Sequence, residues 1–243
     1  MLHIVLLISL VLFFTYGSIV GVKQTKQLLK MKIDEKTRIN YYKAIFSMWL
    51  PVIVLFLVIA FTDITFEDIG FSLLAFNMNK TITIIVLVLA GLWSAYWVCH
   101  IVAFLTSAKF RQYRNKVIKT KTTSDNYYDS VIYNLMIPKT KNEKKWWVAV
   151  SLTAGVCEEV IFRGVYFFLI ASIFPNISVS LVFVIGVGLF GLGHLYQGWK
   201  GFTLATLVGA FLALIYIVSG SLILVILIHF LTDLASAFEY SDE

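Results

Sequence analysis

The sequence predicts an all-α protein, a polytopic transmembrane helical bundle of about seven helices around a cavity that faces the cytoplasm. Hydrophobic residues make up 59% of the 243 positions and charged residues 14%, which is too few polar side chains to cover a globule of this size in water. Long apolar runs exceed the roughly 18 residues at which a transmembrane helix becomes the default interpretation. Lysine and arginine gather between these runs. We therefore expect one domain, integral to the cell membrane.

Seven apolar stretches are the candidate spans: residues 3–22, 44–62, 82–106, 147–173, 178–197, 201–219 and 221–238. The segment Phe66–Phe76 is too short to cross and carries Glu67 and Asp68, so we expect an interfacial helix or a re-entrant piece, with an eighth span as the alternative count. No lysine or arginine precedes Ile4, and no convincing small-residue cleavage site precedes the basic run that begins at Lys23, which favours an uncleaved first span over a signal peptide.

The basic residues predict the orientation. Residues 23–43 hold seven of the twenty lysines and arginines, and residues 109–145 hold ten more. Two spans separate these segments, so both lie on one face, which the positive-inside rule makes cytoplasmic. The N-terminus is then outside and, with seven spans, the C-terminus is cytoplasmic. The net charge of +6 follows from this topology, so we expect contact with the lipid bilayer and no nucleic acid partner.

The chain divides into three parts within the one membrane domain. Residues 1–107 hold the N-terminal transmembrane helices, residues 108–145 form a basic cytoplasmic loop, and residues 146–243 hold the helices with nearly all the chemically unusual residues. Cys99 and Cys157 lie on different spans without a CxxC motif, so they indicate neither a disulfide framework nor a zinc motif.

Seven ionisable residues lie well inside the spans, and six of them fall on three helices in the last hundred residues: Glu158, Glu159, Arg163, His194, His229 and Asp233. A charge near the bilayer centre costs at least about 2.5 to 3.5 kcal/mol on insertion scales, so each one needs a partner or a purpose. The seventh, His100, is expected to make a hydrogen bond within the bundle.

Helical spacing assigns partners to some of these groups. Glu159 and Arg163 are four residues apart and share a helix face, which suits an ion pair. Glu158 points about 100° away, so it is free to face a cavity. The alternative is a structural network in which both glutamates share Arg163.

Two further pairs repeat this spacing. Phe190 and His194 share a face in a glycine-rich run that lets neighbouring helices approach closely: Gly186, Gly188, Gly191 and Gly193. His229 and Asp233 can present two ligands to a metal, or the carboxylate can orient the imidazole. As an alternative, the polar side chains of either pair could have a purely structural role, in which they only make hydrogen bonds within the bundle.

Glutamate and histidine that converge in a wet pocket can activate a water molecule. They do so by direct proton abstraction or through a divalent metal such as zinc, which lowers the pKa of the water. The remaining histidine can donate a hydrogen bond to the developing oxyanion. Hydrolysis of a peptide bond in a membrane peptide or protein substrate fits this chemistry.

Three ordered motifs carry a family resemblance: Glu-Glu-x-x-x-Arg at 158–163, Phe-x-x-x-His at 190–194 and His-x-x-x-Asp at 229–233. With the surrounding runs TAGVCEEVIFRG and HLYQGWKG, they resemble the CAAX protease and bacteriocin-processing family, also called Abi, which includes the type II CAAX prenyl endopeptidases. The resemblance covers roughly residues 136–238. It implies an intramembrane endopeptidase, of the glutamate or metallo type, built as a helical bundle.

The resemblance also implies roles by position. Glu158 would be the general base that activates water, assisted by His194, while His229 and Asp233 would polarise the scissile carbonyl. The same four residues would hold a metal if one takes part. The supporting residues are Glu159, Arg163 and Phe190.

The sequence departs from the family at Asp233. The prenyl endopeptidases usually have asparagine there, whose amide can donate to an oxyanion, whereas an ionised aspartate cannot donate. This favours a role for Asp233 in orienting His229 or in helping to hold a metal.

Two other functions stay open on the sequence. A non-catalytic membrane scaffold or bacteriocin self-immunity protein could keep the same fold and motifs. A proton-coupled transporter would also use intramembrane ionisable groups, but the sequence has neither paired broken helices nor a repeat.

The depths of the motifs also have to agree. Measured from the expected interfacial anchor Trp146/Trp147, Glu158 lies about 18 Å deep, while His194 lies near the end of its stretch. Helix tilt, a longer helix or an inward-opening cavity has to unite them.

Overall fold

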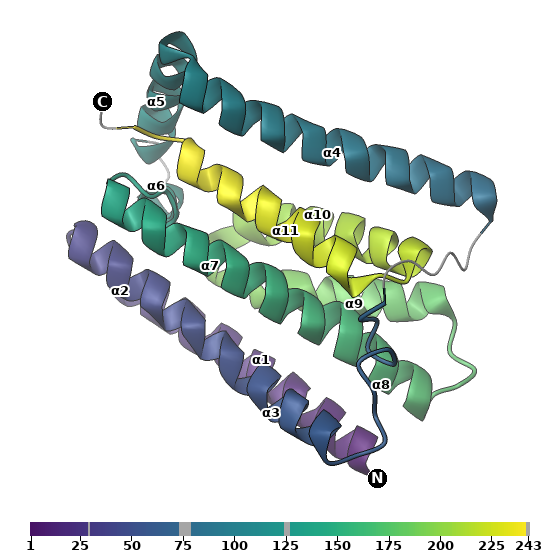
Figure 1. The fold of residues 1–243 in the computed structure, drawn as a ribbon. Coiled ribbons are helices and arrows are strands. Elements are labelled where there is room, and N and C mark those ends of the chain that lie inside the picture. The colour runs from purple at the N-terminus through teal and green to yellow at the C-terminus, as the bar shows by residue number, and fades with distance from the viewer. Residues whose placement is uncertain (29, 73–78, 124–126, 242–243) are drawn as a thin grey trace.

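The computed structural model describes residues 1–28, 30–72, 79–123 and 127–241. The long helices run side by side along one bundle (Figure 1). In chain order they are α1 (Leu2–Leu28), α2 (Glu35–Ile45), α3 (Trp49–Ala60), α4 (Lys80–Thr106), α5 (Ala108–Thr122), α6 (Tyr127–Met136), α7 (Lys141–Glu159), α8 (Tyr166–Ile173), α9 (Val179–Gly193), α10 (Gly198–Ser219) and α11 (Leu222–Ala235). The short helices are η1 (Phe46–Met48), the π-helix η2 (Val160–Val165), η3 (Leu195–Gln197) and η4 (Ser236–Phe238).

Each of the seven predicted stretches coincides with a helix or a continuous helical run. Helices α2, η1 and α3 form one such run, as do α7, η2 and α8. Within the described residues, four runs are long and apolar enough to cross a membrane: Leu2–Leu28, Glu35–Ala60, Lys80–Thr106 and Leu195–Ser219. Helix α9 and the run from α11 to η4 are shorter and apolar. The protein is therefore a helical membrane protein, and seven crossings stays a prediction.

The segment Phe66–Phe76 was expected to be an interfacial helix or a re-entrant piece. The part that the structure describes forms turns, so the helix is wrong there, and residues 73–76 lie outside the described residues. Ile69 is fully buried, and the Gly70 carbonyl accepts a hydrogen bond from the Leu222 N–H at 2.8 Å. The turn is therefore held against the beginning of α11.

The two basic segments meet at one end of the bundle. Helix α7 begins with a capping box between Thr140 and Glu143. The same Glu143 carboxylate, which is fully buried, pairs with Arg38 of α2 at 2.7 Å. Residues 23–43 and 109–145 thus share one end, as the charge pattern predicts. Residues 108–145, which we expected to be a loop, are largely helical because they include α5, α6 and the start of α7.

Helix α7 and the π-helix η2 run through the centre of the molecule. In Figure 1, α7 lies between α11 on one side and the α2–α3 run on the other. Every residue from Cys157 to Tyr166 is buried. A Cβ at Gly155 would lie 3.1 Å from the backbone nitrogen of Phe230, so only glycine lets α7 and α11 approach this closely. This contact sets the first and third motifs side by side.

His100 contacts the chain beyond α11. Its Nε2 lies 3.3 Å from the Phe238 carbonyl oxygen and 3.6 Å from the Glu239 carboxylate, which also pairs with Arg114. The expected hydrogen bond within the bundle is confirmed. His100 therefore joins α4 to the C-terminal segment and stands apart from the motifs. The two cysteines are free, as expected.

Candidate functional site

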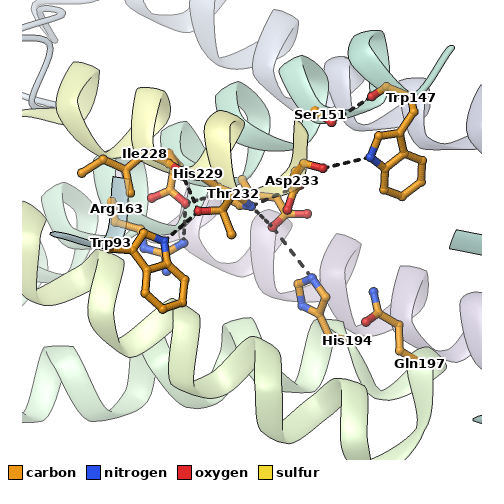
Figure 2. A network of polar contacts seen from close by, with 12 residues as sticks. Trp93, Trp147, Ser151, Arg163, His194, Gln197, Ile228, His229, Thr232 and Asp233 are labelled. Carbon is orange, nitrogen blue, oxygen red and sulfur yellow. Dashed lines mark hydrogen bonds and ion pairs between the residues drawn. The ribbon is translucent and has the colours of Figure 1, made fainter. Parts of the chain in front are cut away.

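The three motifs converge on one centre. The Nε2 atoms of His194, at the end of α9, and of His229, on α11, each lie 3.9 Å from Oε2 of Glu158 on α7. Oδ2 of Asp233 lies 3.6 Å from the His229 Nε2. Figure 2 shows His194, His229 and Asp233 around the same small space. The structure therefore brings together the four residues that the sequence singled out.

A short helix resolves the difference in depth. Helix α9 has 15 residues and ends at Gly193, so it extends only about 22 Å, less than the roughly 30 Å hydrocarbon core of a bilayer. His194 follows directly as its C-terminal cap. The histidine therefore lies inside the bundle, level with Glu158. The alternative of a longer helix is therefore wrong, because α9 is a short one.

Glu159 links the first motif to the third. Its Oε1 accepts hydrogen bonds from Arg163 Nη1 at 3.0 Å and from His229 Nδ1 at 2.6 Å. Glu159 is fully buried and Arg163 is 2% exposed, where an unpaired charge would be costly. The ion pair expected from the spacing is present. The carboxylate nearest to the imidazole is Glu159 on α7, however, and Asp233 on the same helix is farther away.

The Phe190 ring packs against both Arg163 and His194. Its ring lies 4.3 Å from the Arg163 guanidinium and 4.7 Å from the His194 ring. Arg163 Nη2 also donates to the Gly209 carbonyl at 2.8 Å. A Cβ at Gly209 would lie 2.6 Å from the Phe190 ring, so the glycine makes room for this stack. Of the four glycines before His194, two make the expected close approaches and two have open space beside them: Gly186 and Gly191, and Gly188 and Gly193, respectively.

The partners of the ring nitrogens assign the imidazole protons. His194 Nδ1 lies 2.9 Å from the Phe190 carbonyl oxygen, which can only accept, so Nδ1 carries the hydrogen. A neutral His194 then turns the lone pair of Nε2 toward Glu158. His229 likewise uses Nδ1 on the Glu159 carboxylate and turns Nε2 to the same centre. Both imidazoles are thus held by one nitrogen and leave the other for chemistry.

A cavity of about 230 Å³ adjoins this centre. Glu158, His194 and Tyr196 line it, and α1 and α2 supply the opposite walls. The Glu158 Oε2 atom is buried and has no hydrogen-bond partner among the residues that the structure describes. A second cavity, also about 230 Å³, shares Phe14 and Phe162 with the first and is mostly apolar. The site therefore offers a carboxylate oxygen and an imidazole nitrogen beside space for a substrate.

The chemistry of the donor set suits zinc, but its arrangement does not. Two imidazoles and two carboxylates are ligands that zinc accepts. Ligands of one tetrahedral zinc ion lie about 3.3 Å apart, given bonds of about 2.0 to 2.1 Å, whereas Glu158 Oε2 lies 3.9 Å from each Nε2. Within the described ranges, no group of three or more histidine, cysteine, aspartate or glutamate side chains is arranged to hold a metal. We therefore derive no step through a metal.

Two tryptophans hold α11, and sequence reasoning missed them. Trp147, which we expected as an interfacial anchor, is buried, and its indole N–H donates to the Asp233 carbonyl at 2.9 Å. The Trp93 indole donates to the Thr232 hydroxyl at 2.9 Å (Figure 2). No spacing rule indicates these bonds, because each joins residues far apart in the chain.

Fold and site together define a class of protein, a helical membrane protein with a buried glutamate–histidine centre beside a cavity. Comparison with protein families agrees with the motif resemblance. Residues 141–235 match the family model described as type II CAAX prenyl endopeptidase Rce1-like, a range that contains all three motifs. This part of the chain is therefore similar to the Rce1-like family, which is a family of proteases. No curated protein and no solved structure matches the chain.

Proposed function

We propose that this protein is an intramembrane endopeptidase that hydrolyses a peptide bond in a membrane-associated peptide or protein. The observation that carries the proposal is the meeting of Glu158 Oε2 with the Nε2 atoms of His194 and His229, from three different helices, beside a cavity. The protease family of residues 141–235 supports it.

In the proposed reaction Glu158 is the general base. A water molecule beside Oε2 donates one hydrogen to the carboxylate and the other to the lone pair of His194 Nε2, which directs the water oxygen toward the substrate. As the oxygen attacks the scissile carbonyl, Glu158 takes the proton. Glu158 then returns this proton to the nitrogen of the departing amine, so the carboxylate is regenerated.

His229 polarises the carbonyl in this proposal. Glu159 fixes the imidazole through Nδ1. In the protonated ring, Nε2 carries a hydrogen that can be donated to the developing oxyanion. The Asp233 carboxylate, 3.6 Å from this nitrogen, attracts the same hydrogen electrostatically before substrate binds. Arg163 and Phe190 keep Glu159 and His194 in place.

We also propose the orientation and the three-part organisation predicted from the charge pattern. The N-terminal helices (1–107) and the motif-bearing part (146–243) would embed in the bilayer, with the basic segment (108–145) on the cytoplasmic side. The cavity beside Glu158 extends to Leu28 and Tyr41, at the end where the basic segments meet. This supports a site that opens to the cytoplasm.

The test compares membrane peptides by mass spectrometry in cells with the wild-type protein, without it, and with Glu158→Gln. The amide preserves shape but cannot take a proton from water. We expect at least one cleavage product that is present only with the wild type. A scaffold or immunity protein would instead keep its cellular effect in Glu158→Gln and show no such product, which would reject the proposal.

A further inference from the structure

The site contains more hydrogen-bond acceptors than donors, although the oxyanion of the proposed reaction needs donors. When they are ionised, Glu158 and Asp233 can accept hydrogen bonds but cannot donate them, and the free ring nitrogen of neutral His194 also accepts. His229 Nε2 can supply one donated hydrogen, with carboxylate oxygens at 3.6 and 3.9 Å competing for it. Oxyanion sites commonly use more than one donor, aimed at the place where charge develops. A second donor has to come from outside the three motifs.

The cavity is lined by several polar side chains, with Gln24, Thr25 and Tyr41 on the walls formed by α1 and α2. The hydroxyls of Ser18 and Ser47 donate to backbone carbonyls of their own helices, to Phe14 and Ala44, so their hydrogens are engaged. Tyr196 lines the same cavity as Glu158 and His194. It also lies within range of the charges on Glu158 and Asp233.

Contacts of its ring, backbone and hydroxyl hold Tyr196 in one position, which a preorganised hydrogen-bond donor requires. Its ring stacks on the His194 imidazole, with centroids 6.1 Å apart and planes inclined by 25°. Its backbone carbonyl accepts the Tyr128 hydroxyl at 2.5 Å, which anchors η3 to α6. Gln197 Nε2 donates to the Tyr196 hydroxyl oxygen at 2.9 Å. The Tyr41 hydroxyl, in the same cavity, also shares a hydrogen bond with the Tyr196 hydroxyl. When Gln197 and Tyr41 both donate to that oxygen, its own hydrogen is left for another acceptor.

We propose that Tyr196 is a further catalytic residue, whose hydroxyl donates a hydrogen bond to the oxyanion formed from the scissile carbonyl. The inference rests on the proposed function. No proton is transferred: the hydroxyl hydrogen stays on Tyr196 and stabilises the negative oxygen until the carbon–nitrogen bond breaks. Gln197 acts as a positioning residue that directs this hydrogen into the cavity.

The main test is Tyr196→Phe in the detergent-purified full chain. The probe is the synthetic peptide that spans the cleavage site found by comparing wild type with Glu158→Gln. Loss of one oxyanion donor lowers kcat by about 10² to 10³, so we expect a fall of about 100-fold with KM within about threefold. Tyr16→Phe is the matched control, because Tyr16 is 70% exposed on α1, and it should leave kcat unchanged.

Two changes at Gln197 separate donation from simple support. Gln197→Glu keeps the shape but accepts the Tyr196 hydrogen, so kcat should fall as in Tyr196→Phe. Gln197→Leu removes the bond that positions Tyr196 but leaves its hydrogen free to donate, so kcat should fall by less than in Tyr196→Phe. If Gln197→Leu loses as much as Tyr196→Phe, the tyrosine only holds its neighbours and the inference is wrong.

The outcomes distinguish this inference from the proposed function. If no product depends on Glu158, the proposed function fails and the inference fails with it. If Glu158→Gln abolishes cleavage while Tyr196→Phe cleaves at the wild-type rate, only the oxyanion role is rejected. Elution of each variant as a folded monodisperse species controls for misfolding.

Discussion

Removal of both members of the Glu159–Arg163 pair should destabilise the protein by less than the sum of the two single removals. Arg163 makes two hydrogen bonds, to Glu159 Oε1 at 3.0 Å and to the Gly209 carbonyl at 2.8 Å, and stacks on Phe190. Arg163→Met keeps the length of the side chain but leaves the fully buried Glu159 without its cation. Breaking a buried pair from one side costs about 3 to 5 kcal/mol.

Glu159→Gln is the reciprocal change and should cost a similar amount. The amide oxygen can still accept from Arg163 and from His229 Nδ1, so the shape of the network is kept while the guanidinium, 2% exposed, loses its counter-charge. The double variant removes both charges, so neither Glu159 nor Arg163 leaves a buried charge without its partner. Its loss should therefore fall short of the sum of the two single losses by about 2 kcal/mol, within the range measured for residues in one network.

The assay is reversible denaturant unfolding of all four proteins in detergent micelles, analysed as a double-mutant cycle. Lys200→Met is the control, since Lys200 is a cation whose side chain is 75% exposed, and it should change the free energy of unfolding far less than Arg163→Met. Losses that add within about 0.5 kcal/mol would mean that the two charges are not coupled. That result would refute the view that the buried Glu159 and Arg163 side chains stabilise each other.

Two more predictions concern the helix contact and the metal. Gly155→Val should lower both the melting temperature and the cleavage rate, because even its Cβ would lie 3.1 Å from the backbone nitrogen of Phe230. Gly17→Ala is the control, since a Cβ at Gly17 would have nothing within 4 Å. An equal effect of both changes would contradict the view that Gly155 lets α7 and α11 pack closely. Dialysis against a chelator should leave cleavage unchanged, because Glu158 Oε2 lies 3.9 Å from both Nε2 atoms; a loss that stoichiometric zinc restores and magnesium does not would instead make these residues metal ligands.

Much of the fold could be predicted from the chain alone. Apolar runs long enough for lipid have few solutions other than helices, because a backbone without water must satisfy its own hydrogen bonds. This is why each of the seven predicted stretches coincides with a helix. Of the two alternatives for this segment, the interfacial helix is wrong over Phe66–Ser72, where turns form because contacts with Gly220, Ser221 and Leu222 hold the backbone. No local pattern encodes such a partner.

The site divides in the same way. The sequence by itself determined which residues carry chemistry, since charges are costly in lipid and helical spacing pairs Glu159 with Arg163. Only the tertiary structure decided that Glu159 holds His229 from another helix, that Trp147 is buried against α11, and that a short α9 carries His194 level with Glu158. The physical reason is that spacing reports neighbours on one helix, whereas these contacts join helices whose depth and rotation are set by packing.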